Sequence, residues 1–131
     1  MTCGPTEEIV REMFRGDSFI FDVQVFQNDG CTPQNISGWT VWFTAKRYIS
    51  DADSQAVVQL GTALPLTGIV LTAPTNGEAE VTIPPFATSR FPDSPTTLVY
   101  DVQVKDPLTS RVFTVEIGRL IVRPDVTRAI A

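Results

Sequence analysis

Acidic side chains are the residues of this sequence best suited to chemistry. One pair is Glu78 and Glu80, which lie two residues apart and so share one face of an expected strand. The other pair is Asp22 and Asp101, which occupy outward positions on two expected strands that are candidate neighbours in the sheet. Paired carboxylates can hydrolyse glycosidic bonds without histidine when they line a pocket and one has a raised pKa. Acids on the polar face of a sheet more commonly solvate the surface and discourage edge pairing. We therefore expect a solvated face here.

The sequence contains no histidine. This excludes Ser-His-Asp and Cys-His catalysis and removes the commonest metal ligand. The glycines form no phosphate-binding loop, and the acids lack the spacing of a calcium loop. We expect no enzymatic activity, no metal site and no cofactor.

The two cysteines, Cys3 and Cys31, have no metal-ligand spacing. They would pair in an oxidising compartment, but two free thiols are the expectation for a protein made in the cytosol. A formal net charge of -5 argues against nucleic acid as a partner. No apolar run approaches the length of a membrane span, so we expect no membrane contact either.

Alternation of apolar and polar residues with period two runs through most of the chain and predicts short strands. In the last of them the apolar positions shift phase between 117 and 120, which predicts a bulge near Gly118. The expected strands are 9–14, 19–25, 39–45, 55–60 (at an edge), 69–72, 79–83, 98–104 and 111–123.

Turn signals separate these strands. A hairpin is predicted at Thr75-Asn76-Gly77 and another at Asp106-Pro107. A further turn must join two strands at Arg15-Gly16-Asp17, so we interpret this tripeptide as a turn, although integrins recognise the same three residues in other proteins. The pattern predicts an antiparallel immunoglobulin-like β-sandwich of about seven strands, with a small closed barrel as the alternative. Trp39 is expected in its core, and one short helical turn is expected within Phe86–Phe91. The expected organisation is an arm (1–7), a sandwich domain (8–124) and a tail (125–131).

Several apolar residues fall on the outward side of their strands, where a sandwich should be polar. Strand ends, or cover by the segment 50–66, would explain some of them, and the remainder predicts a surface that meets other subunits. Basic residues near the C-terminus are candidate partners for acids of a neighbouring chain. The candidate interface residues are Ile20, Phe26, Trp42, Val99, Ile121, Arg123 and Arg128.

Short segments from about residue 8 to 128 carry a resemblance to a known family. They are Phe14-Arg15-Gly16-Asp17, Asp29-Gly30, Ile36-Ser37-Gly38-Trp39 before Phe43-Thr44-Ala45-Lys46, Gly77, Tyr100-Asp101-Val102-Gln103-Val104, Thr114 to Gly118-Arg119-Leu120, and Asp125-Val126-Thr127-Arg128. This pattern resembles the small β-sandwich modules of tailed bacteriophages and is similar to the N-terminal domain of the baseplate upper protein family.

The resemblance implies an immunoglobulin-like sandwich that assembles into the virion in the host bacterial cytoplasm, as rings or trimers. Its partners would be other virion proteins and copies of itself, and it would have no catalytic residues. The family's long C-terminal extension does not follow here, which favours a tail, baseplate or collar adaptor over receptor recognition. The alternatives are a capsid decoration protein and a carbohydrate-binding module that contacts host glycans through Tyr48, Phe86 and Phe91.

Overall fold

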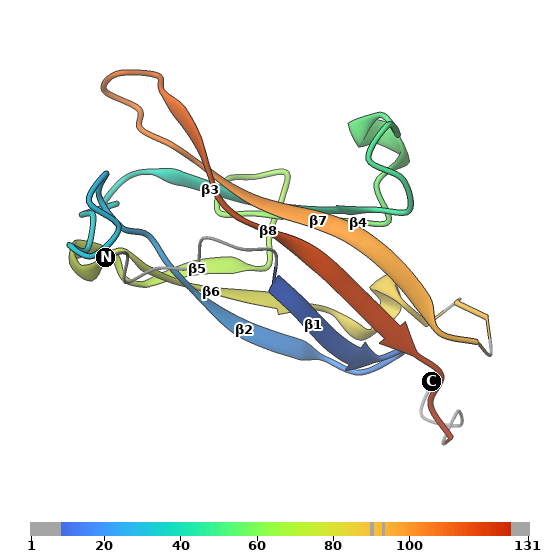
Figure 1. The fold of residues 1–131 in the computed structure, drawn as a ribbon. Helices are drawn as coiled ribbons and strands as arrows, with labels where there is room; N and C mark the ends of the chain where they lie inside the picture. Colours follow the sequence, from blue (N-terminus) through green and yellow to red (C-terminus); the bar gives the residue numbers. More distant parts are fainter. Residues whose placement is uncertain (1–8, 90, 93, 127–131) are drawn as a thin grey trace.

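The chain folds into two β-sheets that pack face to face (Figure 1). The structure is a computed structural model, and it describes residues 9–89, 91–92 and 94–126. Within these residues it has eight strands: β1 (Ile9–Phe14), β2 (Phe19–Gln24), β3 (Thr40–Lys46), β4 (Val58–Gly61), β5 (Ile69–Ala73), β6 (Glu78–Ile83), β7 (Thr96–Lys105) and β8 (Val112–Arg123).

The strand order confirms the immunoglobulin-like sandwich. One sheet has the order β1-β8-β7-β3-β4 and the other has the order β2-β6-β5. The second, sixth and fifth strands thus face the third, seventh and eighth, as in that fold. All pairs are antiparallel except β1 with β8, which run parallel. The eight strands correspond to the eight expected segments, and β4 forms at the sheet edge where an edge strand was predicted at 55–60.

Three short 3-10 turns complete the described part of the chain: η1 (Asp53–Gln55), η2 (Pro74–Asn76) and η3 (Pro85–Ala87). The predicted helical turn is η3, which begins one residue earlier than expected. Both predicted hairpins form, and η2 is capped at its C-terminal end by Gly77, whose φ of 71° lies in the left-handed region that glycine tolerates. The predicted arm lies outside the described residues, as does the tail beyond 126.

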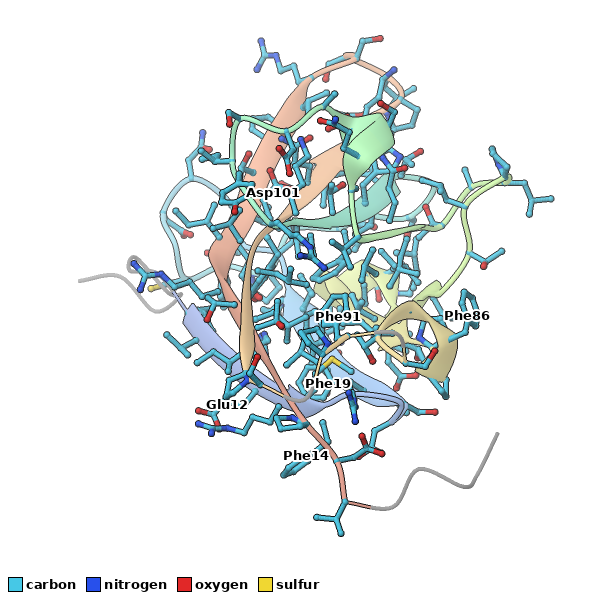
Figure 2. The ribbon with its side chains drawn as sticks, turned by 90° about the vertical axis from the view of Figure 1, so that its right-hand side faces the viewer. Glu12, Phe14, Phe19, Phe86, Phe91 and Asp101 are labelled. Atoms are coloured by element: carbon cyan, nitrogen blue, oxygen red, sulfur yellow. The ribbon has the colours of Figure 1, made fainter. Side chains whose placement is uncertain are left out.

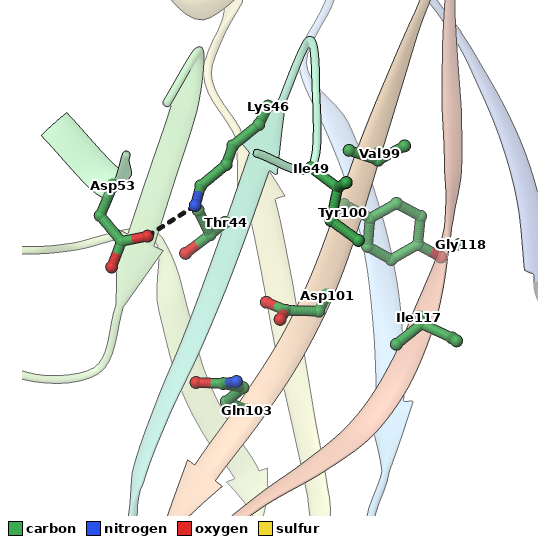
Figure 3. Close-up of a pocket in the computed structure, with 10 residues that line it drawn as sticks. All are labelled: Thr44, Lys46, Ile49, Asp53, Val99, Tyr100, Asp101, Gln103, Ile117 and Gly118. Atoms are coloured by element: carbon green, nitrogen blue, oxygen red, sulfur yellow. Dashed lines mark ion pairs between the residues drawn. The ribbon is translucent and has the colours of Figure 1, made fainter. Parts of the chain in front are cut away.

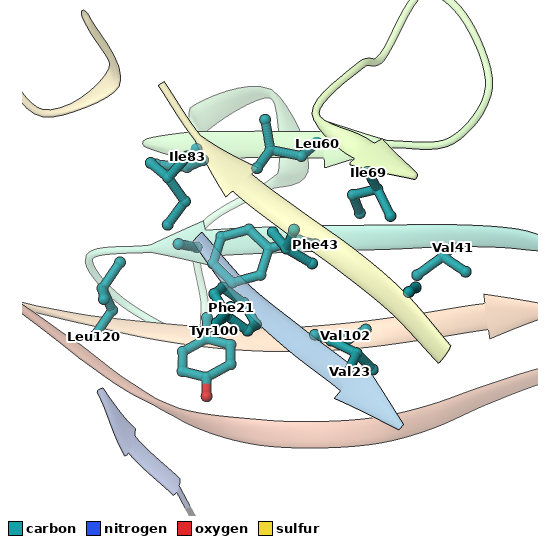
Figure 4. Packing of buried hydrophobic residues seen from close by; sticks show 14 of the residues in the cluster. Phe21, Val23, Val41, Phe43, Leu60, Ile69, Ile83, Tyr100, Val102 and Leu120 are labelled. Carbon is teal, nitrogen blue, oxygen red and sulfur yellow. The ribbon is translucent and has the colours of Figure 1, made fainter. Parts of the chain in front are cut away.

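The core fills the space between the sheets with the inward side chains of both (Figure 4). Its centre is an aromatic group in which the Phe43 ring centroid lies 5.7 Å from that of Phe21 and 5.3 Å from that of Tyr100. Trp39 was expected in the core and lies at its edge. It stands one residue before β3, is partly buried and packs against the buried cluster.

The bulge in β8 lies earlier than predicted. Val102 of β7 is opposite Glu116, while Gln103 is opposite Thr114, so Val115 is the extra residue. Gly118 instead sits in the regular ladder. A Cβ atom there would lie 2.1 Å from the carbonyl oxygen of Ile9, so Gly118 permits the close approach of β1.

This early bulge turns Glu116 into the interior and Ile117 out to solvent. Arg11 of β1 binds the Glu116 carboxylate through Nε at 3.1 Å and Nη2 at 3.2 Å. The Tyr100 hydroxyl donates to the same carboxylate at 2.6 Å, and burial followed by the contact with Glu116 raises the pKa of Tyr100. The Arg11 guanidinium also lies 4.1 Å from the Phe21 ring centroid. These contacts fix β1 to the sheet.

We predict that Glu116→Gln lowers the free energy of unfolding by about 3 kcal/mol, because it leaves the largely buried Arg11 charge without its carboxylate. Urea denaturation would measure the change. Glu12→Gln is the matched control. It removes the exposed 3.1 Å pair between Glu12 and Arg123, which joins the same two strands, and should leave stability close to wild type. Equal losses in the two variants would contradict the role assigned to Glu116.

Truncation of the aromatic centre should be costly. Phe43 is 1% exposed, so Phe43→Ala should lower the free energy of unfolding by about 3–5 kcal/mol through lost burial and a new cavity. Phe86→Ala serves as the control, because Phe86 is 79% exposed on η3. Thermal unfolding of both variants would test this, and a Phe43→Ala protein as stable as the control would show that the core is misassigned.

Candidate functional site

The outward side of the five-stranded sheet, here called the outer face, carries apolar side chains where a sandwich should be polar. In register across it, Ile121 of β8 lies beside Glu12 of β1, and Ile117 lies beside Asp101 of β7. Asp101 is toward one end of this sheet, and Glu12 and Phe14 are toward the other (Figure 2). The outward apolar side chains include Val10, Phe14, Trp42, Val99, Val112, Ile117 and Ile121.

Three predicted interface residues share the outer face, at different levels along it: Trp42, Val99 and Ile121. Ile20 does not join them, because β2 belongs to the three-stranded sheet, where Ile20 is 57% exposed. Phe26 follows β2 and forms a bridge with Pro33 away from both named sheets.

The two predicted basic residues also separate. Arg123 is exposed at the end of β8 and pairs within the molecule with Glu12, while Arg128 lies outside the described residues. Arg123 therefore already has an acidic partner in its own chain.

Trp42 is half-buried because the segment after β4 covers it. A Cβ atom at Gly61 would lie 3.3 Å from Cδ1 of Trp42 and 3.0 Å from Cβ of Leu66, so these groups are packed closely together. The alternative that the segment 50–66 shields part of this face therefore holds for Trp42.

The exposed apolar residues of the outer face that sequence reasoning missed include Val10 (57% exposed), Phe14 (52%) and Ile117 (53%). Val10 and Phe14 alternate with inward residues of β1, so the strand period was the signal that pointed to them. Ile117 was assigned to the interior because the bulge was placed too late.

A groove of about 410 Å³ opens on this face, between β3, β7 and β8 and the segment that carries η1 (Figure 3). Its polar side chains come from alternate outward positions of neighbouring strands, and its apolar walls come from Ile49, Val99 and Ile117. Ile49 belongs to the β3–η1 connection and is 87% exposed. The polar lining includes Thr44, Lys46, Asp53, Asp101 and Gln103.

The charged side chains in this groove differ in whether another group of the chain pairs with them. Lys46 Nζ lies 2.8 Å from Oδ1 of Asp53 and donates to the carbonyl oxygen of Asp51 at 2.8 Å. Asp101 is half-buried, and no described residue donates a hydrogen bond to its carboxylate or forms an ion pair with it. Burial is the main cause that raises the pKa of Asp101; Asp53 adds to this, whereas Lys46 opposes it.

The acid pairs considered from the sequence do not form a catalytic site. Asp22 and Asp101 are not neighbours, since β2 and β7 belong to different sheets. Asp22 instead lies opposite Glu80 on β6, with Glu78 further along the same strand, on the outward side of the three-stranded sheet. Among the described residues, no group of three acidic or cysteine side chains is placed to hold a metal ion.

Two other sequence features have structural roles. Arg15 is buried, binds Asp125 at 2.7 Å and donates to the carbonyl oxygen of Phe91, while Gly16 has the φ of 78° expected in a tight turn. The expectation of free thiols was wrong for Cys31, which is disulfide-bonded. The spacing could not decide this, because pairing depends on proximity in the fold. Cys3 lies outside the described residues.

The aromatic set considered for glycan binding is reduced to two members. Phe91 is buried, and the Arg47 guanidinium lies 5.6 Å from its ring centroid. Tyr48 and Phe86 are exposed but belong to the β3–η1 connection and to η3.

No protein-family model matches the chain. No curated protein matches it. No helix within the described residues is long and apolar enough to cross a membrane.

We predict that Asp101→Asn stabilises the isolated protein at neutral pH. Because folding raises the pKa of Asp101, the folded state binds that proton more tightly, and the carboxylate lowers stability as pH rises above its ordinary pKa of 3.8. The variant should therefore have the higher free energy of unfolding at pH 7, and the difference should vanish well below pH 3.8. Urea titrations across this range would measure it. A variant less stable than wild type at pH 7 would contradict the assignment.

Proposed function

We propose that this chain is a non-enzymatic structural protein of a bacteriophage virion, a tail, baseplate or collar adaptor, that works through contacts of its outer face with other subunits. The observation that carries the proposal is the exposure of Val10, Phe14 and Ile117 on one side of a two-sheet sandwich. Apolar residues gathered on one sheet face are typical of surfaces that meet another protein. The assignment to a virion is supported by the resemblance of the sequence to tailed-phage β-sandwich modules.

The mechanism would be burial of apolar surface at repeated contacts. Each buried square ångström of apolar surface contributes roughly 25 cal/mol, so a contact over part of one sheet is weak in isolation. Repetition of the same contact around a symmetric ring multiplies such weak contacts through effective concentration. The partners would be other virion proteins and copies of this chain, and the protein would act within the assembled particle.

The mass of the purified protein in solution tests self-association. Light scattering over a concentration series should show a stable oligomer such as a trimer or hexamer, and a monomer at every concentration would contradict self-association. Ile117→Asp and Ile121→Asp should shift the mass toward the monomer, because each places a charge in the contact. Circular dichroism should show that both variants stay folded.

Val70→Asp provides the matched control. Val70 is 62% exposed on β5, so it has similar exposure but lies on the opposite sheet. Its oligomeric mass should equal that of the wild type. If Val70→Asp dissociated the oligomer and Ile117→Asp did not, the contact would lie on the three-stranded sheet and the proposed surface would be wrong.

A further inference from the structure

Asp101 is a partly buried acid whose carboxylate accepts no hydrogen bond and forms no ion pair among the described residues. Glu116 is paired with Arg11, and Asp125 is paired with Arg15. A half-buried carboxylate without a partner loses hydration and gains nothing in return. The raised pKa of Asp101 reflects that loss.

The neighbouring cation relieves this charge only in part. Lys46 opposes the rise in the pKa of Asp101, but its ion pair is with Asp53 and its hydrogen bond goes to the carbonyl oxygen of Asp51 (Figure 3). The formal charges of Lys46 and Asp53 cancel, and Asp101 leaves the groove with an excess of one negative charge. Arg119, which lies beside Val99 across β7 and β8, has an interaction of its own and is not among the causes that shift Asp101.

The walls of the groove favour a particular kind of cation. Ile49, Val99 and Ile117 supply apolar surface around the carboxylate, and Gln103 and Thr44 add neutral oxygen atoms that can accept hydrogen bonds. A long side chain with an aliphatic stem and a charged end suits such a lining. Arginine suits it best, because its planar guanidinium binds a carboxylate through two parallel hydrogen bonds and is more weakly hydrated than an ammonium group.

We propose that the groove beside Asp101 receives an arginine side chain of a different protein when that protein covers the outer face of the five-stranded sheet. This inference rests on the proposed function and adds the chemistry of the partner surface. The arginine would pair with the Asp101 carboxylate, and its stem would contact Val99 and Ile117.

At this groove a second copy of this chain is the less suitable occupant. It carries the same net charge of -5 and so offers Asp101 less positive charge than a basic partner does, even where copies meet through apolar residues of the outer face. Most basic side chains within the described residues are also engaged inside their own molecule. Those engaged are Arg11, Arg15, Lys46, Arg47, Arg119 and Arg123.

The test is a heteronuclear NMR titration of the whole chain with Nα-acetyl-arginine amide. Saturable shifts should be confined to backbone amides around Thr44, Lys46, Asp101 and Ile117. Nα-acetyl-citrulline amide, which has nearly the same shape but no charge, should bind about tenfold more weakly if the ion pair contributes about 1.4 kcal/mol. This comparison needs no variant and so does not depend on the folding of a mutant.

Two variants test whether the carboxylate that binds the arginine probe is that of Asp101. Asp101→Asn should weaken binding of the arginine probe about tenfold while it raises stability, which a purely structural residue would not do. Asp22→Asn, on the exposed side of β2, is the matched control and should bind as the wild type does. Equal affinity for the two probes, or unchanged binding by Asp101→Asn, would overturn the inference. Preference for Nα-acetyl-lysine amide over the arginine probe would also overturn it.

The outcome is separable from that of the proposed function. Charge-dependent binding at Asp101 in a protein that is monomeric at every concentration would support the groove and contradict self-association. An oligomer that Ile117→Asp dissociates, in a protein whose groove does not distinguish the two probes, would support the outer face and overturn the arginine site.

Discussion

The buried contact of Arg11 with Glu116 and Tyr100 is the constraint on which the five-stranded sheet depends. Arg11 is on the first strand and Glu116 on the last, so their pairing joins the two ends of the fold. Glu116 can reach Arg11 only if it points inward, and the bulge at Val115 gives it that direction. The alternation that follows then places Ile117 and Ile121 outside. The outward position of these two side chains is thus tied to the bulge that also turns Glu116 toward Arg11.

Asp101 on β7 and Glu116 on β8 are both shielded from water, but only Glu116 forms an ion pair within the described residues. Glu116 loses its water but gains a guanidinium and a phenol, so its charge is compensated inside the chain. Asp101 loses part of its water and gains no partner among the described residues, although Lys46 lies nearby. This loss of stability supports the proposal that the partner of Asp101 is external, because a cation that entered the groove would compensate the carboxylate on binding.

The alternation of apolar and polar residues predicted the strands well, because the inward and outward positions of a strand repeat every two residues. The bulge was misplaced because Val115 and Ile117 are apolar and Glu116 is not, and the Arg11 that reverses this preference is 105 residues away in sequence. Asp22 and Asp101 were both recognised as outward, but only the topology shows that they belong to different sheets. The groove also required the fold of the β3–η1 connection, which no periodicity describes.

The outward sides of the two sheets differ in the chemistry of their side chains. On the three-stranded sheet, Asp22 and Glu80 stand opposite each other and Glu78 follows, so this side favours water even though Ile20 and Val70 are exposed there. On the five-stranded sheet, the groove combines apolar side chains with the carboxylate of Asp101, which no described residue pairs. In the proposal above, a partner with apolar and basic residues enters the groove on this second face. Because the same Arg11–Glu116 contact sets the phase of β8, this preference for one face is built into the register of the sheet.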